Sequence, residues 1–145
     1  MNDNAQLTDN LQEIVEMFSE ASRSERLDLL LDFAESMPNL PKSVIGETFE
    51  QVHECASPVF LRAKMENGHV YYDIDVPREA PTVRGFANIL REGLNGATPE
   101  VIIATPTDLY DRLGLNKILS HQRLNGLTAL LMYMKRQAQQ FVTAA

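Results

Sequence analysis

The spacing of apolar residues changes from a helical period to a strand period and back, and this change constrains the order of elements that the chain can form. Over residues 59–76 apolar side chains fall on alternate positions on both sides of Asn67-Gly68. Alternation is typical of a strand with one face on a core, and Asn-Gly is the strongest short signal for a hairpin turn. The sequence therefore predicts an antiparallel hairpin over residues 59–76, with a third strand around Val44 and Ile45.

Helical spacing of apolar residues flanks this hairpin on both sides. Ser22 and Glu25 have the spacing of a capping box, and Ser120 is the expected cap of a long last helix. The expected helices are residues 8–20, 22–37, 81–94 and 121–141, with two short helices that begin at the Thr-Pro pairs 98–99 and 105–106. The second short helix is expected to end at Gly114. Helices, a small sheet and helices again predict an α+β fold, with helices flanking a small antiparallel sheet.

We expect one domain over residues 1–145, with residues 1–7 as a disordered tail, because a chain of 145 residues can bury one sizeable core. Acidic residues outnumber basic residues, 20 to 13, for a formal net charge of −7. This balance argues against a nucleic-acid surface and against docking on an anionic membrane. No apolar run has the length of a membrane span, and the polar N-terminus lacks the apolar segment of a signal peptide. With one cysteine, the simplest location is the reducing cytoplasm.

Cys55 is the only cysteine, and its segment, HECASP, has neither helical nor strand spacing. A lone free cysteine is most often a small buried hydrophobe. The expected loop favours a functional thiol instead, because loops carry function more often than cores do. A cationic His53 beside the thiol would lower its pKa, whereas Glu54 would raise it. From these residues alone, a structural thiol and a reactive thiol both remain open.

The remaining candidate chemistry rests on three separated histidines and on Arg123. One cysteine and no close histidine pair make neither a zinc site nor an iron–sulfur scaffold, so no metal site is expected. A cysteine hydrolase would need a histidine beside Cys55 and an oxyanion hole, and the sequence indicates neither. Arg123 lies in the first turn of the last expected helix, where a cation opposes the helix dipole. Such a residue either has a functional role or pairs with a nearby carboxylate such as Asp111.

Between about residues 24 and 137 the chain carries four segments in this order: ECASPVFLRAK, EAPTVRGFANILREGLNG, LYDRLGLNKILSHQRLNGL and LLMYMKRQ. Together with the single cysteine they resemble the SufE family, sulfur-acceptor proteins that work with SufS-type cysteine desulfurases. The resemblance implies an α+β fold of the SufE and IscU type, without the extra ligands that IscU-type cluster scaffolds use. It implies that Cys55 attacks the persulfide of the desulfurase, takes the terminal sulfur and carries it to the SufBCD complex, in a reaction like thiol–disulfide exchange.

The resemblance also implies what the protein binds. It would be an accessory protein that activates a desulfurase rather than an enzyme, and it would need no cofactor, because the pyridoxal phosphate belongs to the partner. The expected partners are a SufS-type cysteine desulfurase, a SufBCD-type scaffold complex and a second copy of the chain in a homodimer. We expect Cys55 to be sheltered in the free protein and exposed by a loop movement on docking, since an exposed thiolate would oxidise. The alternative is an interaction module that regulates a partner and whose cysteine is purely structural.

Four further residues are candidates for the site. Glu79 matches an acidic position, often aspartate in the family, that lies near the cysteine loop. Asp111 and Arg123 match positions associated with the partner interface and the active-site region. His53 is a supporting candidate because of its place two residues before the cysteine. Glu54 departs from the family, in which many members have glycine directly before the cysteine, and a glutamate makes the loop stiffer.

Overall fold

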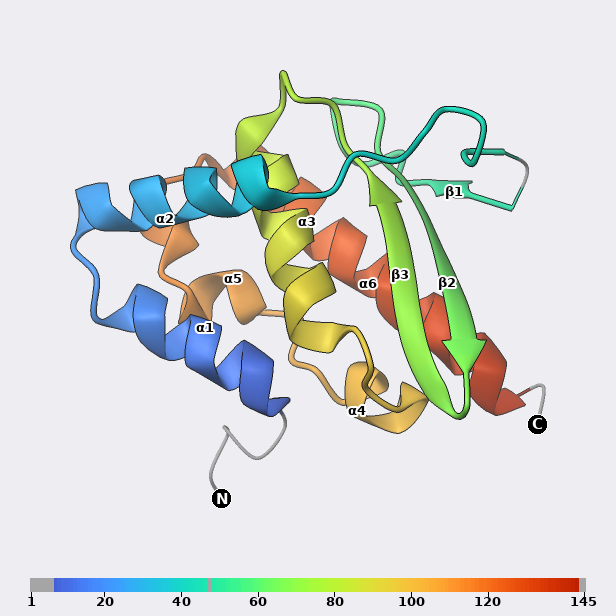
Figure 1. Cartoon of the computed structure of the whole chain (residues 1–145). Coiled ribbons are helices and arrows are strands. Elements are labelled where there is room, and N and C mark those ends of the chain that lie inside the picture. The colour runs from blue at the N-terminus through green and yellow to red at the C-terminus, as the bar shows by residue number, and fades with distance from the viewer. Residues whose placement is uncertain (1–6, 47, 144–145) are drawn as a thin grey trace.

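The computed structural model describes residues 7–46 and 48–143 of the chain. Helices pack around one small sheet (Figure 1), which confirms the expected α+β arrangement. The elements in chain order are α1 (Asp9–Ser19), α2 (Arg23–Ser36), β1 (Glu50–Gln51), β2 (Phe60–Glu66), β3 (His69–Asp75), α3 (Pro81–Leu94), α4 (Pro99–Ile103), α5 (Leu109–Arg112), the 3-10 helix η2 (Leu115–Lys117) and α6 (His121–Thr143). Residues 1–6 of the expected tail lie outside the described residues, and Leu7 packs against the core.

The sheet has the strand order β1-β2-β3 and is antiparallel throughout. The β2–β3 hairpin turns at Asn67 and Gly68, whose φ angles of 52° and 82° both lie in the left-handed region. Two positive φ angles suit a two-residue turn whose twist matches that of the strands, and Asn-Gly adopts them at low cost. The hairpin predicted over residues 59–76 is therefore confirmed.

The third strand is not where the sequence analysis placed it. Residues around Val44 form a turn, in which the Val44 amide donates to the Pro41 carbonyl at 2.9 Å and the Ile45 amide donates to the Lys42 carbonyl at 3.2 Å. Backbone groups used in such local bonds are not available to a sheet. The third strand is instead β1, whose two residues pair with Phe60 and Leu61.

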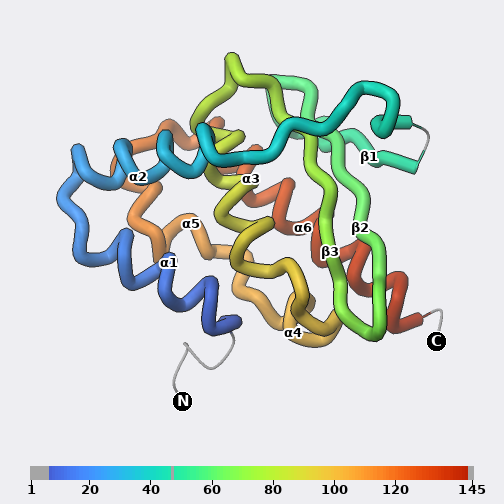
Figure 2. Tube along the Cα trace, viewed as in Figure 1, coloured from blue at the N-terminus to red at the C-terminus, as the bar shows by residue number. Residues whose placement is uncertain are grey.

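The helix α3 lies between the α1–α2 hairpin and the sheet, and α6 runs behind α3 and the two long strands (Figure 2). Both α1 and α2 pack on α3, and α2 comes so close that a Cβ added to Gly85 would lie 2.2 Å from the Leu30 carbonyl oxygen. Ser22 and Glu25 form the predicted capping box of α2. The helical apolar spacing of residues 22–37 does not bury every apolar side chain, because Leu27 is 40% exposed, whereas Leu30 and Ala34 are buried.

The second Thr-Pro pair does not begin a helix. Thr105 is buried at the end of α4, where its hydroxyl donates to the Val101 carbonyl at 3.1 Å, so its side chain is not free to cap a following helix. The next helix, α5, begins only at Leu109. Its predicted end is confirmed, since Gly114 follows it with a φ of 72°.

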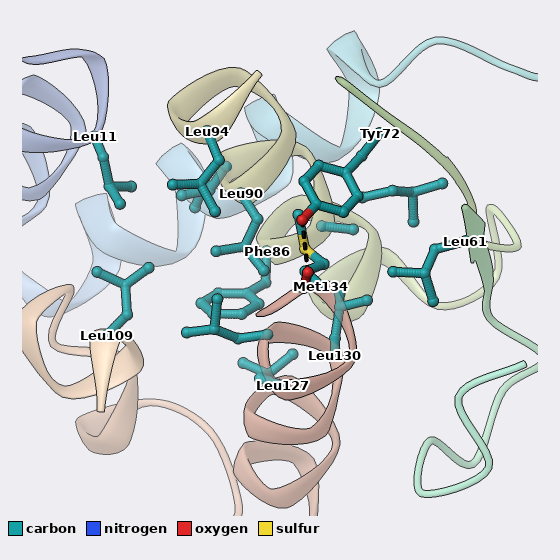
Figure 3. Close-up of a cluster of buried hydrophobic side chains, with 14 of the residues drawn as sticks. Leu11, Leu61, Tyr72, Phe86, Leu90, Leu94, Leu109, Leu127, Leu130 and Met134 are labelled. Carbon is teal, nitrogen blue, oxygen red and sulfur yellow. Dashed lines mark hydrogen bonds between the residues drawn. The ribbon is translucent and has the colours of Figure 1, made fainter. Parts of the chain in front are cut away.

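A single core joins elements from the whole chain (Figure 3). Figure 3 shows side chains of α1, α3, α5 and α6 meeting those of β2 and β3. The Tyr72 hydroxyl donates to the Met134 carbonyl at 2.6 Å, and this buried bond ties β3 to α6. Arg84 of α3 donates to the carbonyls of Ala34 and Met37 at the C-terminal end of α2 and to that of Val76 after β3. Within residues 7–46 and 48–143, no helix combines the length and the apolar character needed to cross a membrane.

Candidate thiol site

The loop that carries Cys55 is closed at its base by two buried valines. Val52 and Val59 are fully buried, and the Val52 amide donates to the Val59 carbonyl at 2.9 Å. Residues 53–58 therefore form the tip of a tight connection between β1 and β2. The Cys55 amide donates back to the Val52 carbonyl at 3.3 Å, which closes a turn over residues 52–55.

The Cys55 side chain is half-buried and packs against the core. Its Sγ donates to the Gly126 carbonyl of α6 at 3.5 Å. The loop packs directly on Gly126, since a Cβ added there would lie in van der Waals contact with Sγ at 3.4 Å and with the Cys55 Cα at 3.7 Å. The free protein thus holds its thiol against the second turn of the long helix.

Burial, and after it the negative charge of Glu54, raises the pKa of the Cys55 thiol from 9.0 to about 11. The thiol of the free protein is therefore protonated at neutral pH. The sequence analysis set His53, which would lower the thiol pKa, against Glu54, which would raise it. Glu54 is the neighbour that shifts this pKa. His53 is exposed, and its charge acts on Glu54 rather than on the sulfur.

Cys55 opens on a pocket of about 380 Å³. The pocket brings Cys55 together with Glu79, from the link between β3 and α3, and with Arg123, from the first turn of α6. Arg123 donates from Nη1 to the buried Thr82 hydroxyl at 2.8 Å, and its amide donates to the Ser120 hydroxyl at 3.3 Å. The site therefore sets one thiol, the two carboxylates of Glu54 and Glu79, and the guanidinium of Arg123 around a common space.

Two candidates from the sequence do not line this pocket, His53 and Asp111. His53 lies on the exposed side of the loop, and Asp111 is exposed on α5. The pairing of Arg123 with Asp111 that the sequence suggested gives way to the hydrogen bond with Thr82. Within the described ranges, no three His, Cys, Asp or Glu side chains gather as a metal site.

Sequence reasoning missed three residues that shape the site, Thr82, Gly126 and Tyr133. The Tyr133 hydroxyl donates to the Glu54 carboxylate at 2.8 Å, which holds the loop tip on α6. Gly126 carried a signal, because a glycine inside a strongly helical pattern costs stability and calls for a packing reason. Thr82 and Tyr133 carried no such signal, because their partners are distant in the sequence. Thr82 lies 41 positions from Arg123, and Tyr133 lies 79 positions from Glu54.

Fold and site together define a small α+β protein with one sheltered thiol at the edge of a charged pocket. The SufE family, described as an Fe–S metabolism associated domain, matches residues 12–138, and the chain belongs to this family. An uncharacterised SufE-like protein of Mycobacterium tuberculosis is 40% identical over 134 residues, which cover 92% of this chain and 94% of that protein. The sulfur acceptor protein CsdE of Escherichia coli is 31% identical over 103 residues, 70% of this chain and 68% of that protein.

A solved structure has the same fold. The solution structure of a hypothetical protein from Thermus thermophilus matches with a TM-score of 0.83 at 36% identity, covering 94% of this chain and 98% of that one. The small antiparallel sheet with flanking helices is therefore the SufE-type fold that the sequence predicted.

Proposed function

We propose that this protein is a sulfur acceptor in Fe–S metabolism, which takes sulfur from a SufS-type cysteine desulfurase onto Cys55 and so stimulates that enzyme. The observation that carries the proposal is the only thiol of the chain, held at the edge of a pocket that also contains Glu79 and Arg123. The family match and the relative CsdE, a sulfur acceptor protein by name, support it.

The proposed step is a transfer between two cysteines. The Cys55 thiolate attacks the outer sulfur of the persulfide on the desulfurase, a new sulfur–sulfur bond forms, and the old one breaks. The desulfurase cysteine leaves as a thiolate, so no external oxidant or reductant is needed. The Arg123 guanidinium would stabilise the thiolate and persulfide anions in the pocket, and the Glu79 carboxylate would accept the thiol proton.

Several finer points belong to this proposal. The carrier would pass its sulfur to a SufBCD-type complex, and it would do so in the cytoplasm, where free thiols stay reduced. It would need no cofactor of its own, because the pyridoxal phosphate would belong to the desulfurase. As the only thiol, Cys55 would have no neighbour in its own chain to resolve the persulfide into a disulfide. Docking would have to expose the half-buried thiol.

Intact-mass spectrometry tests the proposal directly. Wild type and Cys55→Ser are incubated with a SufS-type desulfurase and free cysteine, and each protein is weighed before and after reduction. We expect the wild type alone to gain one sulfur atom and to lose it on reduction. If several desulfurases load neither protein, the sulfur-acceptor function is wrong.

A second candidate function is an interaction module with a structural cysteine. The burial of Cys55 against Gly126 and the raised thiol pKa favour it, because both suit a packing role. It predicts that Cys55→Ser stimulates the desulfurase as well as the wild type does. The sulfur-acceptor function predicts that this variant binds the enzyme and fails to stimulate it.

A further inference from the structure

The Cys55 loop is attached to α6 by two separate sets of side-chain contacts. At the base, Glu50 accepts hydrogen bonds from Arg136 at 2.5 Å and from Gln137 at 3.0 Å. At the tip, Glu54 accepts the Tyr133 hydroxyl at 2.8 Å. The hydrogen bond between Tyr133 and Glu54 therefore ties the residue directly before Cys55 to α6.

The base of the loop does not depend on the tip contact. The buried valines 52 and 59 and the pairing of β1 with β2 hold the base in place. Between these anchors the tip contacts α6 through Tyr133–Glu54 and through the weaker bond from the Cys55 Sγ to the Gly126 carbonyl at 3.5 Å. Loss of the tyrosine hydroxyl would thus free the tip while leaving the base and the core intact.

We propose that Tyr133 is a positioning residue for Cys55, acting through Glu54 to hold the loop tip on α6 and the thiol against Gly126. The inference rests on the proposed function for its purpose, since a partner that receives or donates sulfur must release this contact. The positioning itself is a property of the free protein. It makes Tyr133–Glu54 the contact that sets how often the thiol becomes accessible.

The charges around the contact support its persistence at neutral pH. Arg136 lies over the Tyr133 ring at 4.5 Å and also pairs with Glu50, so it braces the tyrosine from the side of β1. The hydrogen bond from Tyr133 lowers the pKa of Glu54, and the same bond raises the pKa of Tyr133. The other charged groups near the tip or in the thiol pocket are His53, Glu79 and Arg123.

Alkylation of Cys55 in the free protein tests the inference, because the chain has one thiol. Tyr133→Phe removes only the hydroxyl. We expect its alkylation by iodoacetamide at pH 8 to be about three- to tenfold faster than in wild type, the range expected for losing one exposed hydrogen bond. The pH at half-maximal rate should fall from about 11 towards 9.0, because burial is the larger cause of the raised pKa. The midpoint of urea unfolding should fall only slightly, as expected for the loss of one hydrogen bond, and unfolding should remain a single step.

Two further variants keep the test decisive. Glu54→Ala should accelerate alkylation at least as much, since it removes the other partner of the same bond, and it applies even if Tyr133→Phe is poorly folded. Tyr71→Phe, on β3, is the matched control and should alkylate at the wild-type rate. Wild-type rates in both loop variants, or equal acceleration in the control, would overturn the inference. Alkylation needs no desulfurase, so this result is independent of whether Cys55 accepts sulfur.

Discussion

At the scale of single residues, burial decides the state of the Cys55 thiol, and the charge of one neighbour adds to its effect. His53 and Glu54 both directly precede Cys55. The pKa of the thiol is nevertheless raised mainly by burial and secondly by the charge of Glu54. An isolated protein with this site keeps its cysteine as a neutral thiol, which is oxidised less readily than a thiolate.

The first prediction concerns Glu54→Gln, which keeps a hydrogen-bond acceptor for Tyr133 and removes the charge. The wild-type alkylation rate should rise about tenfold per pH unit between pH 8 and 10, because only the thiolate reacts and its pKa is about 11. Glu54→Gln should shift the half-maximal pH downwards, to a value still above 9.0, since burial remains. The measurement is the rate of iodoacetamide alkylation against pH, with the urea-unfolded chain as control. Identical profiles for variant and wild type would exclude a role for the Glu54 charge.

The second prediction concerns Arg123, whose guanidinium lines the pocket beside the thiol. Arg123→Gln should lower the rate of sulfur loading from a desulfurase by about tenfold or more, because a cation near a developing thiolate stabilises it. Alkylation of the free protein should change little, since Arg123 is not among the causes of the raised thiol pKa. Single-turnover loading followed by mass spectrometry measures the effect, and Arg123→Lys should recover part of the rate. Equal loss in both assays would indicate a general disturbance of the fold.

At the scale of elements, the packing of α2 on α3 is limited by the backbone at Gly85. Alanine normally stabilises a helix relative to glycine, yet a Cβ here would lie 2.2 Å from the Leu30 carbonyl oxygen. The two helices would have to separate, and Arg84, which donates to carbonyls at the end of α2, would move with them. Backbone contact rather than helix propensity therefore decides which residue is tolerated at this position.

The third prediction follows from this contact. Gly85→Ala should destabilise the protein by about 1–3 kcal/mol, the usual cost of overpacking a close interface. Gly46→Ala is the control, because a Cβ there meets no atom within 4 Å, and its effect should stay within about 0.5 kcal/mol. Urea unfolding followed by circular dichroism measures both. A Gly85→Ala protein as stable as wild type would mean that α2 moves away from α3 without cost.

At the scale of the whole molecule, one core includes residues from α1 to α6, and the Cys55 loop lies at its surface. Loop variants should therefore change reactivity with at most a small loss of global stability, whereas core variants should mainly lower the stability of the whole protein. Tyr72 is such a core residue, because its buried hydrogen bond to the Met134 carbonyl connects the sheet with α6.

The fourth prediction is that the wild type unfolds in one cooperative step, with coincident transitions by far-ultraviolet circular dichroism and tyrosine fluorescence. Tyr72→Phe should lower the free energy of unfolding by about 0.5–1.5 kcal/mol, the net value of one hydrogen bond, and should shift both signals together. Tyr71→Phe, at a half-buried position of the same strand, should have a smaller effect. Separate transitions for the two signals would show that sheet and helices unfold independently.

The sequence by itself determined the order of the elements, the β2–β3 hairpin, the cap of α2 and the last helix, because caps, turns and apolar periods depend on residues within a few positions of one another. The local signal failed at Thr105, which is buried at the end of α4 and whose carbonyl accepts a hydrogen bond from Lys135, thirty positions away. The tertiary structure alone decided the environment of Cys55. Its contacts cross 71 positions to Gly126, and the neighbouring Glu54 reaches 79 positions to Tyr133. No periodic pattern encodes such distances, since they depend on how α6 packs against the loop once both have formed.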